Sequence, residues 1–63
     1  MIKLTRLGSH ELVLNAELIQ TVEATPDTVI TLLNGQKLVV EESVEEVIGL
    51  VVGYKRSING FTE

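Results

Sequence analysis

The chain of 63 residues has no cysteine, one histidine and a formal net charge of −4. It therefore has no means of forming disulfides or thiolate zinc sites of its own, and it lacks the imidazoles for a histidine-rich metal site. Its acidic balance argues against nucleic acid as a partner, because nucleic-acid binders present a concentrated basic surface. A chain this short buries only about 60% of the surface that its unfolded form exposes, so we expect it to gain stability as a homo-oligomer.

The N-terminal segment predicts a β-hairpin. Residues 2–7 alternate between apolar and polar side chains, as a half-buried strand does. Gly8-Ser9 predicts a tight turn, and residues 11–14 form the returning strand, with Leu12 and Leu14 directed inward. This charged, alternating start is unlike the apolar core of an export signal, and no apolar run approaches the roughly 20 residues that span a bilayer. We therefore expect a cytoplasmic protein without direct membrane insertion.

A third strand is predicted between two turns. Asn15 tolerates turn conformations, so residues 15–17 form a bend or a single helical turn. Residues 18–24 then form the strand, and Leu18, Val22 and Ala24 share one of its faces. Pro26 presets φ for a turn over residues 25–27.

The centre of the chain predicts a second hairpin. Residues 28–33 and 36–40 are rich in apolar and β-branched side chains, and Asn34-Gly35 joins them. Asn-Gly in this setting predicts a two-residue type I′ turn with positive φ at both residues. That turn sets a register in which Leu33 faces Gln36 and Val29 faces Val40.

In this register the second hairpin has two apolar faces, so it needs two covering layers. One face carries Ile30, Leu32 and Val39, and the C-terminal helix is available to cover one face. The opposite face carries Val29, Leu33, Leu38 and Val40. We interpret these four residues as a self-association surface, together with the strand edges.

Residues 43–58 predict a helix. Ser43 and Glu46 form a capping box, in which each side chain accepts a hydrogen bond from the backbone N–H of the other residue. Acidic residues in the first turn and basic residues near the end complement the helix dipole. One broad apolar stripe consists of Val44, Val47, Ile48, Val51, Tyr54 and Ile58, with Val52 and Leu50 widening it. Residues 59–63 follow as a frayed tail.

Gly49 and Gly53 lie four residues apart, on the side of this helix opposite the apolar stripe. They are a candidate helix contact, because small residues at this spacing let a second helix approach closely. The alternative, which we favour, is a solvent face, where each glycine costs about 1 kcal/mol of helix stability relative to alanine.

Together these elements predict a single domain over residues 1–58, of mainly β (α+β) class. Five antiparallel strands in the order βββββα form a small sheet or a partly open barrel, followed by the one C-terminal helix.

No constellation in the sequence supports catalysis, a metal or a cofactor. Ser9 and His10 are neighbours on a turn, which does not bring the hydroxyl to the ring, and no third group is indicated to orient them. The glutamates at positions 41, 42, 45 and 46 are spread over a strand end and a helical turn, where capping and the dipole account for them. We therefore expect a non-enzymatic protein that acts by protein–protein interaction.

Several blocks of the chain resemble the small flagellar FlbD/SwrD family. The most specific are Asn15-Ala16-Glu17-Leu18-Ile19 and Thr25-Pro26-Asp27-Thr28, and the likeness also covers Met1–Leu7, Leu33–Gly35 and Glu42–Ile48. The chain departs from the family pattern at Gly8-Ser9, where Asn-Gly is expected, and at Gly49 and Gly53, where charged or helix-favouring residues are expected. The second departure weakens the helix. The resemblance implies a cytoplasmic, non-enzymatic protein that supports motility, with flagellar motor or stator proteins as partners at the cytoplasmic face of the motor.

A second likeness supplies an alternative function. The opening Leu4-Thr5-Arg6, five strands and terminal helix are similar in size and order to the carbon-storage-regulator family, whose swapped β dimers bind RNA. That family uses the first strand and an arginine just before the helix. Here the segment just before the helix, where that family has its arginine, is Glu41-Glu42-Ser43. Its carboxylates repel phosphate, so the RNA-binding alternative is the weaker one.

Overall fold

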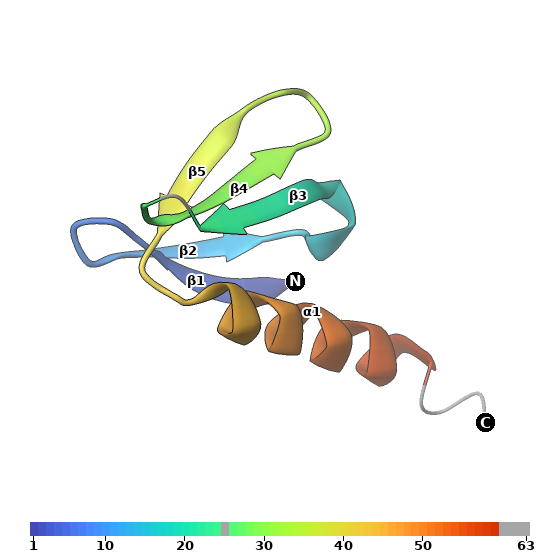
Figure 1. The fold of residues 1–63 in the computed structure, drawn as a ribbon. Helices are drawn as coiled ribbons and strands as arrows, with labels where there is room; N and C mark the ends of the chain where they lie inside the picture. Colours follow the sequence, from blue (N-terminus) through green and yellow to red (C-terminus); the bar gives the residue numbers. More distant parts are fainter. Residues whose placement is uncertain (25, 60–63) are drawn as a thin grey trace.

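The computed structural model describes residues 1–24 and 26–59, the last three by their helical backbone. Its elements are β1 (Ile2–Arg6), β2 (His10–Leu14), the 3-10 turn η1 (Ala16–Leu18), β3 (Ile19–Ala24), β4 (Thr28–Leu32), β5 (Lys37–Val40) and α1 (Val44–Asn59) (Figure 1). The five strands form one sheet in the order β2-β1-β5-β4-β3, and every neighbouring pair is antiparallel. The predicted fold class is confirmed, and the sheet is open rather than closed into a barrel, with β2 and β3 as its edges.

The sheet consists of two parts that are joined at one corner. β1 pairs with β2 along its whole length, whereas β1 and β5 share the single residue pair Arg6–Val40. Two backbone hydrogen bonds flank that pair, from Leu7 N–H to the Val39 carbonyl at 3.0 Å and from Glu41 N–H to the Thr5 carbonyl at 2.8 Å. β4 and β5 therefore turn away from β1 and β2 beyond this corner, and α1 lies below β1 (Figure 1).

The core lies between α1 and the concave side of this sheet. α1 contacts β1 and β3, and Val47 on its inner side is completely buried. The remaining buried apolar residues alternate along the strands, as period-two patterning requires. They are Ile2, Leu4, Leu14, Ala16, Ile30, Leu32, Leu38 and Val40.

The predicted register of the second hairpin is wrong by one residue. Ile30 lies opposite Leu38 instead of Val39, and the loop contains three residues, 33–35, instead of two. Only Gly35 in this loop has a positive φ, of 89°. The side chain of Asn34 accepts a hydrogen bond from Gln36 N–H at 2.9 Å, which stabilises a turn with Asn34 at negative φ.

This shift changes which residues share a face, because a slip of one residue exchanges the two faces of a strand. Leu38 and Val40 join Ile30 and Leu32 in the core. The opposite face carries half-buried valines at positions 29 and 39, together with threonines and charged residues. The prediction of two fully apolar faces is therefore wrong, and the outer face of the sheet is mixed.

β3 contains an irregularity that the sequence analysis did not predict. The pairing with β4 shifts between Ile19 and Thr21, so that Gln20 is an extra residue. Ile19 and Val22, three residues apart, both pack against the core as a result, whereas Leu18 and Ala24 are exposed. Thr25 of the predicted turn lies outside the described residues.

The capping box at the start of α1 is confirmed. Ser43 N–H donates to Glu46 Oε1 at 2.9 Å, and Glu46 N–H donates to Ser43 Oγ at 3.1 Å. The helix extends to Asn59, one residue beyond the predicted end, and residues 60–63 of the predicted tail lie outside the described residues. Within the described part of the chain, no helix is long and apolar enough to cross a membrane.

Candidate functional site

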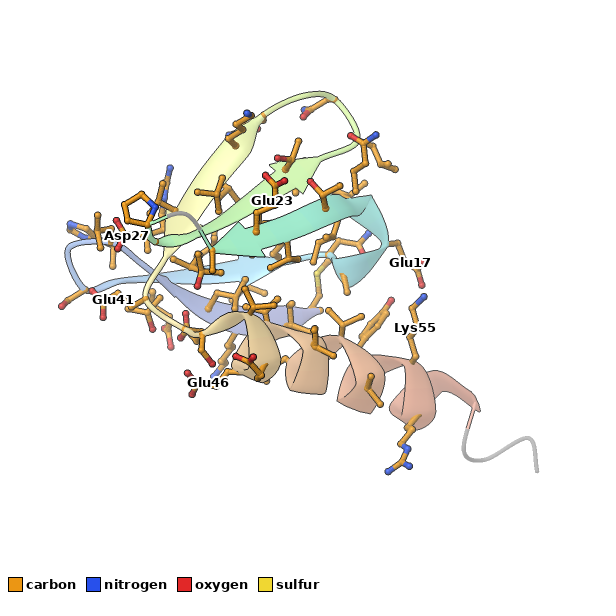
Figure 2. All side chains as sticks on the ribbon, in the orientation of Figure 1. Glu17, Glu23, Asp27, Glu41, Glu46 and Lys55 are labelled. Carbon is orange, nitrogen blue, oxygen red and sulfur yellow. The ribbon has the colours of Figure 1, made fainter. Side chains whose placement is uncertain are left out.

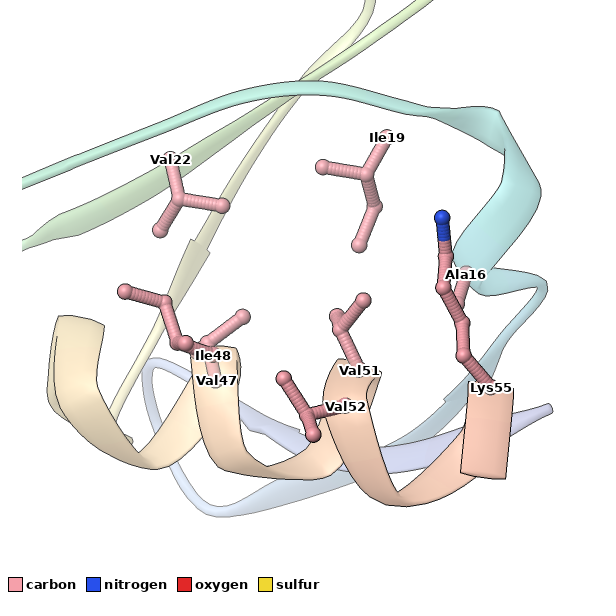
Figure 3. A pocket seen from close by; sticks show the side chains of 8 residues that line it. All are labelled: Ala16, Ile19, Val22, Val47, Ile48, Val51, Val52 and Lys55. Atoms are coloured by element: carbon pink, nitrogen blue, oxygen red, sulfur yellow. The ribbon is translucent and has the colours of Figure 1, made fainter. Parts of the chain in front are cut away.

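An apolar groove separates the outer part of α1 from β3 (Figure 3). Its volume is about 220 Å³, and it is open to solvent. The lining residues come from α1, β3 and η1, and they are Ala16, Ile19, Val22, Val47, Ile48, Val51, Val52 and Lys55. Seven of these eight side chains are apolar, so the groove is a surface where an apolar partner removes water favourably.

The wall formed by α1 arises because the apolar stripe of the helix is wider than its contact with the sheet. Val47 is buried at the base of the groove and Val51 is half-buried, whereas Ile48 is 52% exposed and Val52 is 47% exposed. Their i, i+4 spacing places Ile48 and Val52 one above the other along the rim. The broad stripe was predicted, but its partial exposure was not.

The opposite wall depends on the bulge in β3. Because Gln20 is an extra residue, Ile19 and Val22 both point from β3 towards α1 (Figure 3). Ala16 of η1 closes the groove beside them, and hydrogen bonds hold this segment. Asn15 Oδ1 accepts from Glu17 N–H at 3.0 Å, and the Leu18 carbonyl accepts from Leu33 N–H at 2.8 Å.

Lys55 is the charged residue of the lining, and its side chain rises from α1 beside Ala16 at one end of the groove (Figure 3). Its apolar stem lines the wall while the ammonium group reaches solvent. Figure 2 shows Lys55 at this end of α1, and Glu41 and Glu46 near its beginning. Lys55 thus marks the end of the groove near η1, where Figure 2 also shows Glu17 of η1.

Two carboxylates hold the opposite end of the molecule together. Glu41 Oε2 accepts from Ser9 N–H at 2.9 Å, and Glu42 Oε1 accepts from Thr5 N–H at 2.9 Å. Burial raises the pKa of Glu42, but the hydrogen bonds from Thr5 outweigh it, and the pKa lies below its ordinary value. These glutamates thus fix the segment between β5 and α1 against the first hairpin. Among the residues that the structure describes, no three side chains are grouped so that they could hold a metal ion.

The structure separates the four residues predicted as a self-association surface. Leu38 is 5% exposed and Val40 is 1% exposed, so both belong to the core. Val29 is half-buried on the opposite face of the sheet, and Leu33 is 63% exposed in the turn. The register shift is the cause. These residues do not form one surface. On α1, Ile48, Leu50 and Val52 are exposed apolar side chains.

Gly49 and Gly53 lie on the exposed side of α1. A Cβ atom added at either position would meet nothing within 4 Å. No packing within the described chain therefore requires glycine at these positions. The groove itself was missed from the sequence because its walls are more than 20 residues apart in the chain, and the bulge that completes it has no local signature.

A family model of flagellar and swarming motility proteins, FlbD, matches residues 1–59. The chain belongs to this family. The resemblance seen in the sequence is thereby confirmed over nearly the whole chain, and the family is one of motility proteins rather than of known enzymes. Comparison with curated proteins and with solved structures gave no match.

Proposed function

We propose that this protein supports flagellar motility as a non-enzymatic accessory of the motor, by binding a protein partner in the groove between α1 and β3. The family supplies the role in flagellar and swarming motility. The observation that carries the mechanism is the groove, whose rim leaves Ile48 and Val52 half exposed. Apolar side chains around an open groove form a surface where the apolar side chains of a partner are removed from water.

The lining defines the chemistry of the partner. Apolar side chains of the partner fill the space between Ile19, Val22 and Val51, where their burial is favourable. A carboxylate on the partner meets Lys55 at the end near η1, which fixes the direction in which the segment binds. We propose a flagellar motor or stator protein, at the cytoplasmic face of the motor, as the source of this segment.

The RNA-binding alternative gains no support from the electrostatics of β1. In that alternative the first strand contacts RNA, but the carboxylates of Glu41 and Glu42 accept hydrogen bonds from Ser9 and Thr5 at this strand and its turn. Two negative charges beside the strand repel a phosphate backbone. The groove, in contrast, carries no acidic residue.

Complementation of a deletion strain tests the proposal. We expect loss of the gene to reduce swarming, and the wild-type gene to restore it. Lys55→Glu reverses the charge at one end of the groove and should fail to restore swarming, whereas Leu50→Glu changes an exposed apolar residue of α1 outside the lining and should restore it. Equal swarming with the two variants, at equal protein levels, would rule out the groove as the working surface.

A further inference from the structure

The outward side of α1 presents an ordered set of exposed side chains. On a helix of about 3.6 residues per turn, these residues follow one another around the axis as an apolar edge, a charged centre and a glycine edge. In that order they are Ile48 and Val52, Glu45 and Arg56, and Gly49 and Gly53. This side points away from Val47 and the core, so the fold of a single chain does not cover it.

Two antiparallel copies of this side complement each other. When two copies of one helix pack antiparallel about a two-fold axis, each residue meets a residue of the other copy. The sequence numbers of the two residues then add up to the same total at every contact. The sum is 100 for Ile48 with Val52, 101 for Glu45 with Arg56, and 102 for Gly49 with Gly53. One axis passing between Leu50 and Val51 therefore aligns all three pairs to within about 1.5 Å along the helix.

The two-fold axis stands perpendicular to the plane of the two helices and maps each edge onto the same edge of the partner. The apolar edges meet each other, and each Glu45 meets an Arg56 at both ends of the contact. The glycine edges also meet, and there the absence of side chains lets the backbones approach closely. Since a Cβ at Gly49 or Gly53 would contact nothing within the chain, this close approach gives both glycines a role.

We propose that the side of α1 formed by Glu45, Ile48, Gly49, Val52, Gly53 and Arg56 is the interface between two copies of this chain, packed as an antiparallel helix pair. The occupant is a second copy because this two-fold axis places Glu45 of each chain opposite Arg56 of the other, so the charges of this side are complementary to themselves. A single pair of helices forms an interface at the small end of the range, below about 1,200 Å², so we expect a weak dimer with a micromolar dissociation constant.

The proposed dimer brings the two grooves close to each other. Ile48 and Val52 border both the groove and the helix contact, and the axis places the two apolar edges together. The two grooves consequently open on the same side of the helix pair. A dimer of this kind binds two copies of a partner segment, or a repeated segment, with increased avidity.

Charge-reversal variants test the pairing by sedimentation equilibrium between about 5 and about 500 μM, a range suited to a weak interface. In a dimer of the Glu45→Arg variant, two arginines face each other at each end of the contact, and in a dimer of the Arg56→Glu variant two glutamates do. We therefore expect each variant alone to weaken the dimer at least about tenfold. An equimolar mixture of the two variants restores both attractive pairs across the interface. We therefore expect the mixture to regain the wild-type mass, twice the 6.9 kDa of the chain.

The mixture of the two variants distinguishes pairing between chains from an effect of the same charges on the dipole of their own helix. Each reversal also opposes the dipole of its own helix, and that effect persists in the mixture. A mixture that stays monomeric while circular dichroism shows folded chains would overturn the proposal. A wild-type chain that is monomeric over the whole concentration range would do the same, as would single variants that dimerise like the wild type.

The glycines provide a second measurement. Gly49→Gln combined with Gly53→Gln favours the helix and should raise the melting temperature of the monomer, but the two side chains block the close approach and should abolish the dimer. A double variant that dimerises at least as tightly as the wild type would contradict the proposed packing. These experiments use the purified chain, so their outcome is independent of the groove and of the motility experiment.

Discussion

Replacing Val47 by alanine tests how α1 packs on the sheet, and Val52 on the same helix provides a matched control. Val47 is fully buried, whereas Val52 is half exposed on the rim of the groove. Removing two buried methyl groups costs about 1.6 kcal/mol of transfer free energy. An unfilled cavity adds about 1 kcal/mol, and the better helix propensity of alanine returns about 0.5 kcal/mol.

The expected loss for Val47→Ala is therefore about 2 kcal/mol, while Val52→Ala should change the free energy of unfolding by less than about 0.5 kcal/mol. Urea titration followed by circular dichroism, at a protein concentration too low for self-association, measures both. For a chain of this size, with a denaturant slope of about 1 kcal/mol/M, the midpoint should fall by about 2 M for Val47→Ala.

The comparison depends only on the orientation of α1. A wrong rotation of the helix would expose Val47 and bury Val52, and the order of the two losses would then be reversed. Equal losses would show that α1 does not pack on the sheet through one defined face. Either result would refute the packing from which the groove is built.

Three further predictions concern the turn between β1 and β2, the N-terminal cap of α1, and the hydrogen bond from Thr5 to Glu42. Ser9 has a positive φ of 68°, so Ser9→Gly should raise the free energy of unfolding by about 1 kcal/mol in thermal melts, and an unchanged melting temperature would contradict the strain. Ser43→Ala removes one half of the capping box and should lower stability by about 1 kcal/mol, whereas equal helix content and stability would contradict the cap. Because the folded pKa of Glu42 is lowered, its stabilisation is present above the ordinary glutamate pKa and is lost as the pH falls through the folded value. The difference in stability between wild type and Glu42→Gln should therefore be largest near neutral pH and vanish in acid, and a difference that is constant with pH would contradict the bond to Thr5.

Patterns that are local in sequence predicted much of the fold. The alternation in residues 2–14 gave the first hairpin, because period two is enough to assign the buried face of a strand. Ser43 and Glu46 gave the start of α1, because both partners of the capping box lie within one turn. The family was also identified from short blocks of sequence.

Two features were beyond local reasoning, and both affect the candidate site. Asn34-Gly35 is compatible with loops of two or three residues, and the hydrogen bond from Gln36 N–H to Asn34 favours the longer one. That difference of one residue moved Leu38 from the expected outer face into the core. The bulge at Gln20 depends on tertiary packing against α1, so the alternation in residues 18–24 predicted Leu18 in place of Ile19.

Photo-crosslinking in motile cells tests the central claim, that the groove between α1 and β3 is the surface that binds the motor. A photoreactive residue replaces Lys55 at the end of the groove or, as a control, Lys37, which lies on β5 beside the buried Leu38 and faces the other side of the sheet. We predict that position 55 crosslinks to a flagellar motor or stator protein and that position 37 does not. A motor protein captured from position 37 but not from position 55 would contradict the account.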